Sequence, residues 1–126
     1  MTRHLLAPLL ALMALAACAA TSAPDMTVEE FLAIHERARM NSAAHLQNDT
    51  QRMIAASDHA IAAVRAEQAE ARRAGRRPFN CLPETQNVTL MDVADALDGL
   101  PAEQRRTATV REALMDWAEK TYPCLR

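Results

Sequence analysis

The chain has 126 residues, a length that favours a single domain, and half of them are hydrophobic. Its 14 basic and 16 acidic residues give a formal net charge of −2, which is not the basic balance of a nucleic-acid-binding protein. With only two glycines, the sequence also excludes a glycine-rich phosphate-binding loop.

The first 17 residues have the pattern of a secretory signal peptide. Arg3 and His4 precede an apolar run from Leu5 to Ala17, and small residues follow it. The run is shorter than the roughly 20 residues that span a membrane. We therefore expect residues 1–17 to be removed on export. The loss of Arg3 leaves 13 basic residues against the same 16 acidic ones.

The end of this run, Leu15-Ala16-Ala17-Cys18, resembles the lipobox of bacterial lipoproteins. The resemblance implies that Cys18 is acylated, with residues 18–25 as a short tether to the domain. The alanine after the cysteine is similar to the sorting signal for the outer rather than the inner membrane. The alternative is an ordinary signal peptide cut after Ala20 or Ala23. Either route leads to the periplasm.

A first helix is predicted to begin after Thr27 and to end at about Ser42. Thr27 and Glu30 have the spacing of a capping box, in which each side chain bonds the backbone N–H of the other residue. Met26 and Phe31 fit a hydrophobic staple around the same start. The predicted apolar stripe of this helix is Val28, Phe31, Leu32 and His35.

A second helical segment follows, with two interpretations of its start. Asn48 and Asp49 either cap a new helix or lie on the exposed face of one long helix that continues the first. From Gln51 to Arg73 the residues are mostly strong helix formers. Gly75 is well placed to end the helix in a left-handed conformation. The predicted apolar face is Ile54, Ser57, Ile61 and Val64.

A short helix is predicted between Thr89 and Gly99. Thr89 is its N-cap and Asp92 occupies the capping-box position. Gly99 favours termination of this helix. Residues 102–106 are expected to add a single helical turn.

The last predicted helix begins at a third capping box, formed by Thr109 and Glu112, and ends before Pro123. Its predicted apolar face is Val110, Ala113, Leu114, Trp117 and Thr121. No stretch alternates apolar and polar residues over the length of a strand. The expected fold is therefore all-α, a small bundle of about four helices in residues 26–126 closed by one disulfide.

Cys81 and Cys124 bracket the last two helices and are expected to form that disulfide. An odd total of three cysteines needs an explanation, and acylation of Cys18 leaves this one pair. An oxidising periplasm allows the bond to form. Because the two cysteines are 43 positions apart, the bond is expected to stabilise the domain by about 4 kcal/mol in the chain-entropy model. The alternative is two independent buried thiols.

Candidate catalytic groups are few. His35, His45 and His59 are 10 and 14 positions apart, whereas two metal ligands on one helix face are typically four apart. Neither cysteine of the domain is expected to act as a nucleophile, because the disulfide takes both. We therefore expect no metal site, no cofactor and no enzymatic activity.

The end of the second helical segment carries four arginines: Arg72, Arg73, Arg76 and Arg77. One interpretation is a solvated helix end whose charges offset the helix dipole. The functional interpretation is a patch for an acidic partner or an anionic membrane surface. Phe79 is expected to pack under the disulfide rather than form a contact surface. Trp117 and Tyr122 are expected in the core.

Several motifs of the C-terminal half occur in a fixed order. They are Cys81-Leu82-Pro83, a helix that ends Ala96-Leu97-Asp98-Gly99-Leu100-Pro101, Ala113-Leu114, and the closing Tyr122-Pro123-Cys124. Over about residues 79–126 this pattern resembles the Rap/Tai family, the small periplasmic immunity proteins associated with type VI secretion. The resemblance implies an all-helical fold with a disulfide between Cys81 and Cys124.

The same resemblance implies a binding protein. Members of the family block peptidoglycan amidase toxins, often as dimers, so the expected partners are a peptidoglycan hydrolase and a second copy of the chain. We expect no nucleic acid partner and membrane contact through the lipid anchor only. The alternative is an envelope structural or chaperone-like lipoprotein, since the acid-stress periplasmic chaperones are also small, helical and singly disulfide-bonded. No residue is assigned to partner binding.

Overall fold

The computed structural model describes residues 25–41, 43 and 47–125. These residues form five helices and no strand longer than an isolated bridge between Thr27 and Thr109. The helices are α1 (Val28–Met40), α2 (Asn48–Arg73), α3 (Leu90–Asp98), α4 (Ala102–Thr107) and α5 (Val110–Thr121). The predicted all-α fold is confirmed. The helix beyond the expected four is α4, where a single turn was predicted.

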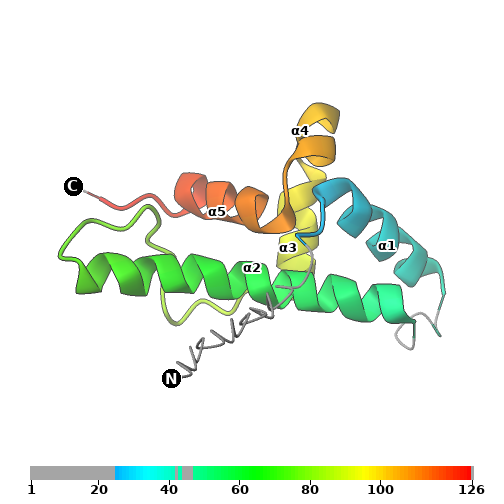
Figure 1. Cartoon of the computed structure of the whole chain (residues 1–126), viewed down its shortest axis with the longest axis horizontal. Helices are drawn as coiled ribbons and strands as arrows, with labels where there is room; N and C mark the ends of the chain where they lie inside the picture. The colour runs from blue at the N-terminus through cyan, green and yellow to red at the C-terminus, as the bar shows by residue number, and fades with distance from the viewer. Residues whose placement is uncertain (1–24, 42, 44–46, 126) are drawn as a thin grey trace, which may run out of the picture.

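The long helix α2 runs the length of the molecule (Figure 1). The figure shows α5 lying along one part of α2 and α1 near its other end, with α3 between them and α4 projecting away from α2. The C-terminal tail ends beside the turn that follows α2. Three helices, α1, α3 and α5, are therefore packed on one long helix, and α4 is packed on α1.

The start of α1 agrees with the prediction only in part. The Thr27 hydroxyl accepts a 3.2 Å hydrogen bond from the Glu30 N–H, as a cap requires. The prediction of a full capping box is wrong, because the reciprocal bond does not form. The Glu30 carboxylate instead accepts a 2.9 Å hydrogen bond from the Arg52 guanidinium of α2. Met26 and Phe31 are both buried, consistent with the predicted staple. The stripe also includes Ile34, which is buried.

The beginnings of α1 and α5 are joined to each other. The Val28 N–H donates to the Ala108 carbonyl at 3.0 Å, and the Val110 N–H donates to the Met26 carbonyl at 2.9 Å. Both donors belong to the first turn of a helix, where backbone N–H groups have no partner within the helix. The pairing of these two segments thus satisfies one such N–H group at the start of each helix.

The structure resolves the question of one helix or two. α1 ends at Met40, two residues before the predicted Ser42, and α2 begins at Asn48. Its N-cap is Gln47, whose side chain makes no capping bond. The buried face of α2 is Thr50, Met53, Ser57, Ala60, Val64, Gln68 and Ala71. The predicted face is thus correct at Ser57 and Val64, and it continues past Val64 through a polar residue.

The turn after α2 has the predicted left-handed glycine. Gly75 has φ +66°, and its N–H donates to the Arg72 carbonyl at 3.2 Å. The Arg76 N–H donates to the Ala71 carbonyl at 3.0 Å. These two bonds form a Schellman motif, which satisfies carbonyl groups of the last turn.

Both remaining capping boxes are confirmed. Thr89 with Asp92 at the start of α3, and Thr109 with Glu112 at the start of α5, make both reciprocal bonds. The predicted face of α5 is wrong at one position, since Thr121 is exposed. Its buried residues are Val110, Ala113, Leu114 and Ala118.

Every buried apolar residue of the described chain lies between Met26 and Ala118. The largest completely buried side chains come from four helices and include Phe31, Met53, Leu97 and Leu114. The segment from residue 25 onward therefore contains this whole core and can fold as a unit. Among the described helices, none is long and apolar enough to cross a membrane.

Candidate functional site

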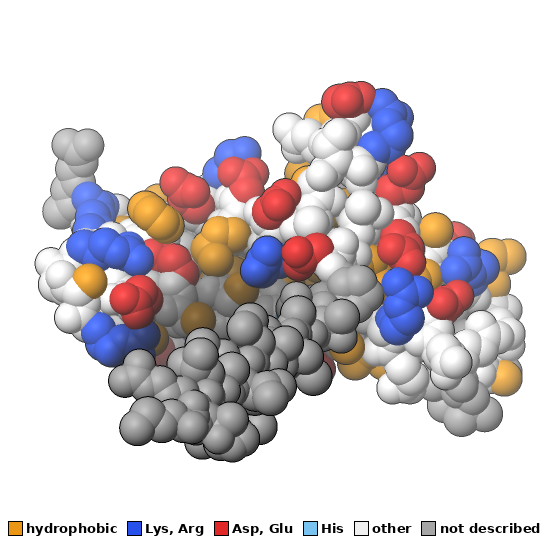
Figure 2. All heavy atoms as spheres, viewed as in Figure 1, with side chains coloured by type: hydrophobic (Ala, Val, Ile, Leu, Met, Phe, Trp, Pro, Cys, Tyr) orange, Lys and Arg blue, Asp and Glu red, His pale blue; other side chains and the backbone are white. Residues whose placement is uncertain are grey.

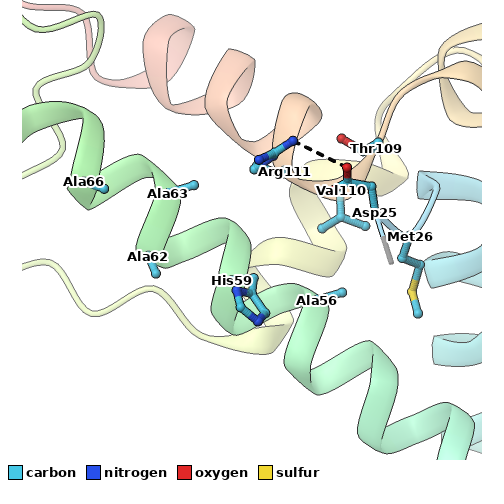
Figure 3. A pocket seen from close by; sticks show the side chains of 10 residues that line it. All are labelled: Asp25, Met26, Ala56, His59, Ala62, Ala63, Ala66, Thr109, Val110 and Arg111. Atoms are coloured by element: carbon cyan, nitrogen blue, oxygen red, sulfur yellow. Dashed lines mark ion pairs between the residues drawn. The ribbon is translucent and has the colours of Figure 1, made fainter. Parts of the chain in front are cut away.

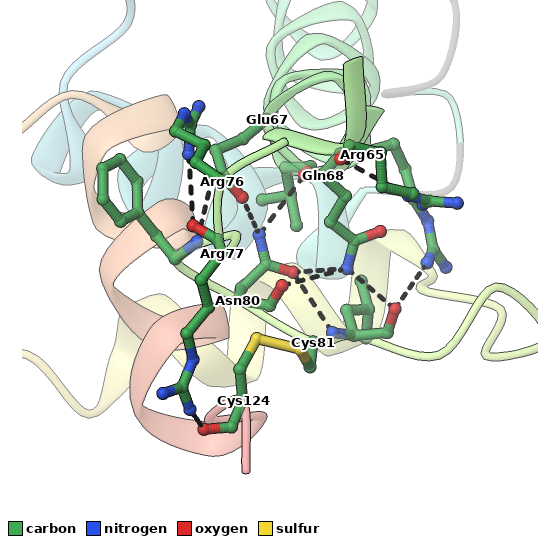
Figure 4. Close-up of a disulfide and its surroundings, with 12 residues drawn as sticks. Arg65, Glu67, Gln68, Arg76, Arg77, Asn80, Cys81 and Cys124 are labelled. Carbon is green, nitrogen blue, oxygen red and sulfur yellow. Dashed lines mark hydrogen bonds and ion pairs between the residues drawn. A yellow bond between two sulfur atoms is a disulfide. The ribbon is translucent and has the colours of Figure 1, made fainter. Parts of the chain in front are cut away.

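The disulfide fastens the C-terminal tail to the linker of residues 74–89 between α2 and α3 (Figure 4). Cys81 and Cys124 are bonded, with their Cα atoms 5.0 Å apart, so the predicted disulfide is confirmed. The Cys81 N–H also donates to the Tyr122 carbonyl at 2.7 Å. The Arg77 guanidinium donates to the Cys124 carbonyl. We call this arrangement the clasp.

A buried polar network lies beneath the clasp. The Gln68 amide donates to the Asn80 side-chain oxygen at 2.7 Å and to the Leu82 carbonyl at 2.9 Å. The Asn80 amide in turn donates to the Val64 carbonyl at 3.3 Å and to the Glu67 carboxylate at 3.1 Å. Gln68 and Asn80 are both buried, so these bonds satisfy groups that would otherwise be costly to desolvate.

Sequence reasoning missed this network, although a signal exists. Gln68 follows Val64 by four positions on the same helix face, so a continuous buried face predicts a buried glutamine there. Its partner could not be found in this way, because Asn80 lies in a linker without periodicity. Figure 4 shows the two side chains facing each other just above Cys81.

Arg65 holds the next part of the linker. Its guanidinium donates to three backbone carbonyls, those of Leu82 at 3.1 Å, Pro83 at 2.8 Å and Gln86 at 2.7 Å. These carbonyls belong to a stretch with no regular secondary structure. The arginine therefore positions a segment that has no hydrogen-bond ladder of its own.

Phe79 does not pack under the disulfide, and that prediction is wrong. Its side chain is 60% exposed, whereas Asn80 and Leu82 are buried. Successive side chains of an extended segment point to opposite sides, so burying Asn80 turns its neighbour Phe79 outward. The Arg76 guanidinium lies 5.1 Å from the centre of the exposed ring. This geometry is a cation–π contact on the surface.

Each arginine of the predicted basic cluster has a partner near the clasp. Arg72 pairs with Glu84 at 2.8 Å, Arg73 pairs with Glu70, and Arg76 pairs with Glu67 at 3.1 Å. Arg77 donates to the carbonyl described above. These bonds support the interpretation of a solvated, compensated helix end. Hydrogen bonds from Arg73 and Arg72 lower the pKa of Glu70 and of Glu84, respectively, so both carboxylates stay ionised at neutral pH.

The glutamates near the end of α2 do not cancel all of the positive charge of the arginines there. Residues 65–84 contain five arginines and three glutamates, a net charge of +2, which leaves nine basic and 13 acidic residues elsewhere, a net charge of −4. Arg65 and Arg77 bond backbone carbonyls, which do not cancel their charge. Figure 2 shows basic side chains gathered at the end of the molecule where α2 finishes. We call residues 65–84 together with 122–125 the clasp end.

The structure does not bring the candidate histidines together. The His35 ring stacks on Phe31 of the same helix, with ring centres 6.4 Å apart. His59 is exposed on α2 and lines a groove. His45 and the predicted lipidation site Cys18 lie outside the described residues. Within the described part of the chain, no group of three or more His, Cys, Asp or Glu side chains could hold a metal ion.

A small apolar groove lies between α2 and the start of α5 (Figure 3). It has a volume of about 310 Å³, and an ion pair of 3.5 Å between Asp25 and Arg111 lies at its edge. Its lining includes four alanines of α2: Ala56, Ala62, Ala63 and Ala66. One imidazole and one ion pair on an alanine surface do not form a nucleophile–base constellation.

A second groove, between α1 and α3, has a different character. Its volume is about 520 Å³. The lining is Leu32, His35, Glu36, Arg39, Met91, Ala94, Asp95, Asp98 and Arg105, a mixture of apolar side chains and charges of both signs. Met91 is 54% exposed, and methionine is a flexible side chain that adapts to different partners.

Comparisons of the chain with models of known families, with curated proteins and with solved structures give no match. The resemblance of the C-terminal motifs to the Rap/Tai family therefore stays a prediction.

Proposed function

We propose that the protein is an exported, lipid-anchored binding protein of the Rap/Tai type that neutralises a peptidoglycan hydrolase in the periplasm. The observation that carries the proposal is the clasp. Cys81-Leu82-Pro83 and Tyr122-Pro123-Cys124, the two ends of the motif pattern, are joined by the disulfide and by the bond from Cys81 to the Tyr122 carbonyl. An oxidised clasp of this kind also fits an exported protein.

In this proposal the protein acts by binding alone. It covers the active site of the hydrolase through an interface of standard size, about 1,600 Å² in total, and chemically changes neither partner. A small domain with a buried core and a rigid clasp is suited to this task, because a preformed surface loses little conformational entropy on binding.

The groove between α1 and α3 is our candidate for the contact with the hydrolase. The stem peptides of peptidoglycan carry carboxylates, so we expect basic groups in the cleft of a hydrolase that binds them. Three carboxylates and two arginines line the groove, so its net charge of −1 complements such groups. Arg39 pairs with Glu36 at 3.2 Å and Arg105 lies 3.9 Å from Asp98, which leaves Asp95 as the carboxylate without an ion pair among the described residues. The exposed Met91, which lines the same groove, supplies an apolar anchor.

The test is a pull-down with the oxidised domain of residues 25–126 against the secreted hydrolases of the same cell. We expect one hydrolase to be recovered and its activity to be suppressed at an equimolar ratio. Recovery of nothing, or of many unrelated proteins, would contradict the proposal. Those outcomes would favour the structural or chaperone-like alternative.

A pair of exposed residues then tests the surface separately from the function. Met91→Arg places a bulky cation at the groove and should abolish hydrolase binding. Leu125→Arg makes the same change at the clasp end, where the side chain is 92% exposed, and should leave binding intact. If both variants still bind the hydrolase, the groove is the wrong surface although the function stands.

A further inference from the structure

Two apolar side chains project into solvent beside the disulfide. Phe79 lies two residues before Cys81 and Leu125 lies one residue after Cys124, and they are 60% and 92% exposed. Because the disulfide brings the two chain segments together, both side chains belong to one end of the molecule. Neither side chain belongs to the buried core.

Cations stand next to both apolar side chains. Arg76 lies over the ring of Phe79, and Arg77 is bonded to the carbonyl of Cys124, the residue before Leu125. A separate groove of about 420 Å³ lies on the other side of α2 and does not border either apolar side chain; it is lined by Arg65, Gln68, Ala69, Arg72, Arg73 and Glu84. Guanidinium groups bind phosphate oxygens in a planar, bidentate geometry. The clasp end thus combines phosphate-binding groups with projecting apolar residues.

The charge distribution favours one orientation of the protein at an anionic surface. Residues 65–84 have a net charge of +2, and the rest of the chain has a net charge of −4. An anionic surface therefore attracts the clasp end and repels the remainder of the protein. The segment is also held in place before binding, by the disulfide and by the Gln68 bond to Asn80, so docking orders little additional chain.

We propose that the clasp end docks on an anionic phospholipid surface, with Arg76 and Arg77 at the lipid phosphates and Phe79 and Leu125 in the interfacial layer. A protein hot spot usually fills a pocket on its partner, whereas two separate apolar side chains with arginines next to them fit a planar surface of mobile headgroups. The inference concerns a second membrane contact besides any lipid anchor, and it does not depend on the proposed binding of a hydrolase.

The test is co-sedimentation of the oxidised domain of residues 25–126 with lipid vesicles. This domain lacks Cys18, so acylation cannot contribute. We expect binding to vesicles of phosphatidylcholine mixed equally with phosphatidylglycerol, and none to phosphatidylcholine alone. Raising the salt from about 0.05 M to about 0.5 M should weaken the binding, because screening shortens the range of the attraction.

Matched variants locate the contact. Arg77→Gln should weaken vesicle binding about fivefold, the usual contribution of one cation near an anionic membrane. Arg37→Gln removes an exposed cation from α1, at the other end of the molecule in Figure 1, and should change nothing. Phe79→Ala should weaken binding several-fold without any change in charge, whereas Met40→Ala, at the exposed end of α1, should not.

Several outcomes would overturn the proposal. They are equal binding to both kinds of vesicle, equal effects of Arg77→Gln and Arg37→Gln, and displacement from vesicles by inorganic phosphate at an ionic strength where chloride does not displace. The last result would indicate a site for free phosphate. If Phe79→Ala and Arg77→Gln abolish binding to a hydrolase and the domain does not bind vesicles, the clasp end is a protein interface instead.

Discussion

The side chains of Gln68 in α2 and Asn80 in the linker bond each other at 2.7 Å, and both are buried. Asn80 directly precedes Cys81, so this pair holds the linker on α2 at the position where the disulfide begins. The C-terminal tail is therefore attached to a segment that is already fixed. Covalent and non-covalent restraints act together on the clasp end.

Gln68→Leu should destabilise the domain by about 1–3 kcal/mol. The leucine fills a similar volume, but the Leu82 carbonyl loses a donor and the Asn80 oxygen keeps only the Leu82 N–H, at 3.2 Å. Urea unfolding of the oxidised domain measures the change. The exposed Gln104→Leu is the control and should alter the free energy of unfolding by less than about 0.5 kcal/mol. Equal effects of the two variants would show that the buried network contributes nothing.

Reducing the disulfide should remove about 4 kcal/mol of stability, because the two cysteines are 43 positions apart. A domain of this size has a total stability of about 5–10 kcal/mol, so the reduced protein should still be folded, with a much lower urea midpoint. Far-UV circular dichroism during urea unfolding, with and without reductant, measures the helical content and the urea midpoint. An unchanged midpoint would contradict the prediction. The Cys81→Ser/Cys124→Ser double variant should behave like the reduced protein.

Ser57→Ala should raise the stability by up to about 1 kcal/mol. The Ser57 hydroxyl is buried on α2 and has no hydrogen-bond partner among the described residues. Alanine removes this unsatisfied group and is also the better helix former. Thermal unfolding of the variant beside the wild-type domain measures the effect. A loss of stability would mean that the hydroxyl has a partner in solution.

Asp92→Asn should reduce the sensitivity of the domain to acid. The pKa of Asp92 is lowered because its carboxylate accepts 2.7 Å hydrogen bonds from the Thr89 N–H and hydroxyl. A lowered pKa in the folded state gives stability that is present above the unfolded pKa of about 3.9 and is lost as the pH falls through the folded pKa. The variant should be less stable than wild type at pH 7 and should lose less stability below about pH 4.

Asp95→Asn is the matched control for this experiment, since Asp95 lies on α3 one turn beyond the cap. Urea midpoints across the pH range should give a flatter curve for Asp92→Asn than for wild type. Asp95→Asn removes the same charge from α3 without removing the cap, so a flattening caused by the cap should be larger in Asp92→Asn. Parallel curves for wild type and Asp92→Asn would rule out a contribution of the cap to acid sensitivity.

Tyr122→Leu should destabilise the end of α5 by about 1 kcal/mol and change the emission of Trp117. The two rings meet edge to face with their centres 5.7 Å apart, a contact that adds to the burial of both. Trp117 is the only tryptophan of the chain, so the emission comes from the residue that makes this contact. An emission spectrum identical to wild type would contradict the contact. Tyr122→Phe keeps the ring and should preserve the contact and the wild-type emission.

Helix starts and stops could be predicted from the sequence because they depend on neighbouring residues. The Thr89 and Thr109 caps and the Gly75 turn each satisfy backbone groups through bonds between residues at most five positions apart. The pairing of Cys81 with Cys124 was also predictable, by elimination among three cysteines. These features fix the all-α fold and the presence of the clasp.

The partners of individual side chains could not be predicted in the same way. The sequence predicts that Glu30 caps its own helix, yet Glu30 bonds Arg52, which is 22 positions away and is brought close by the packing of α1 on α2. The sequence also predicts that Phe79 packs under the disulfide, yet Asn80 occupies the buried side of the linker because Gln68 supplies its partner.

The helices, their ends and the disulfide follow from the sequence, since each rests on local hydrogen bonds or on residue type. Which face of the linker is buried depends on tertiary packing, and the same packing places Phe79 and Arg76 together on the exposed surface of the clasp end. The physical reason is that burial of a polar side chain requires a partner, and Gln68 and Asn80 become partners only when the linker folds back on α2.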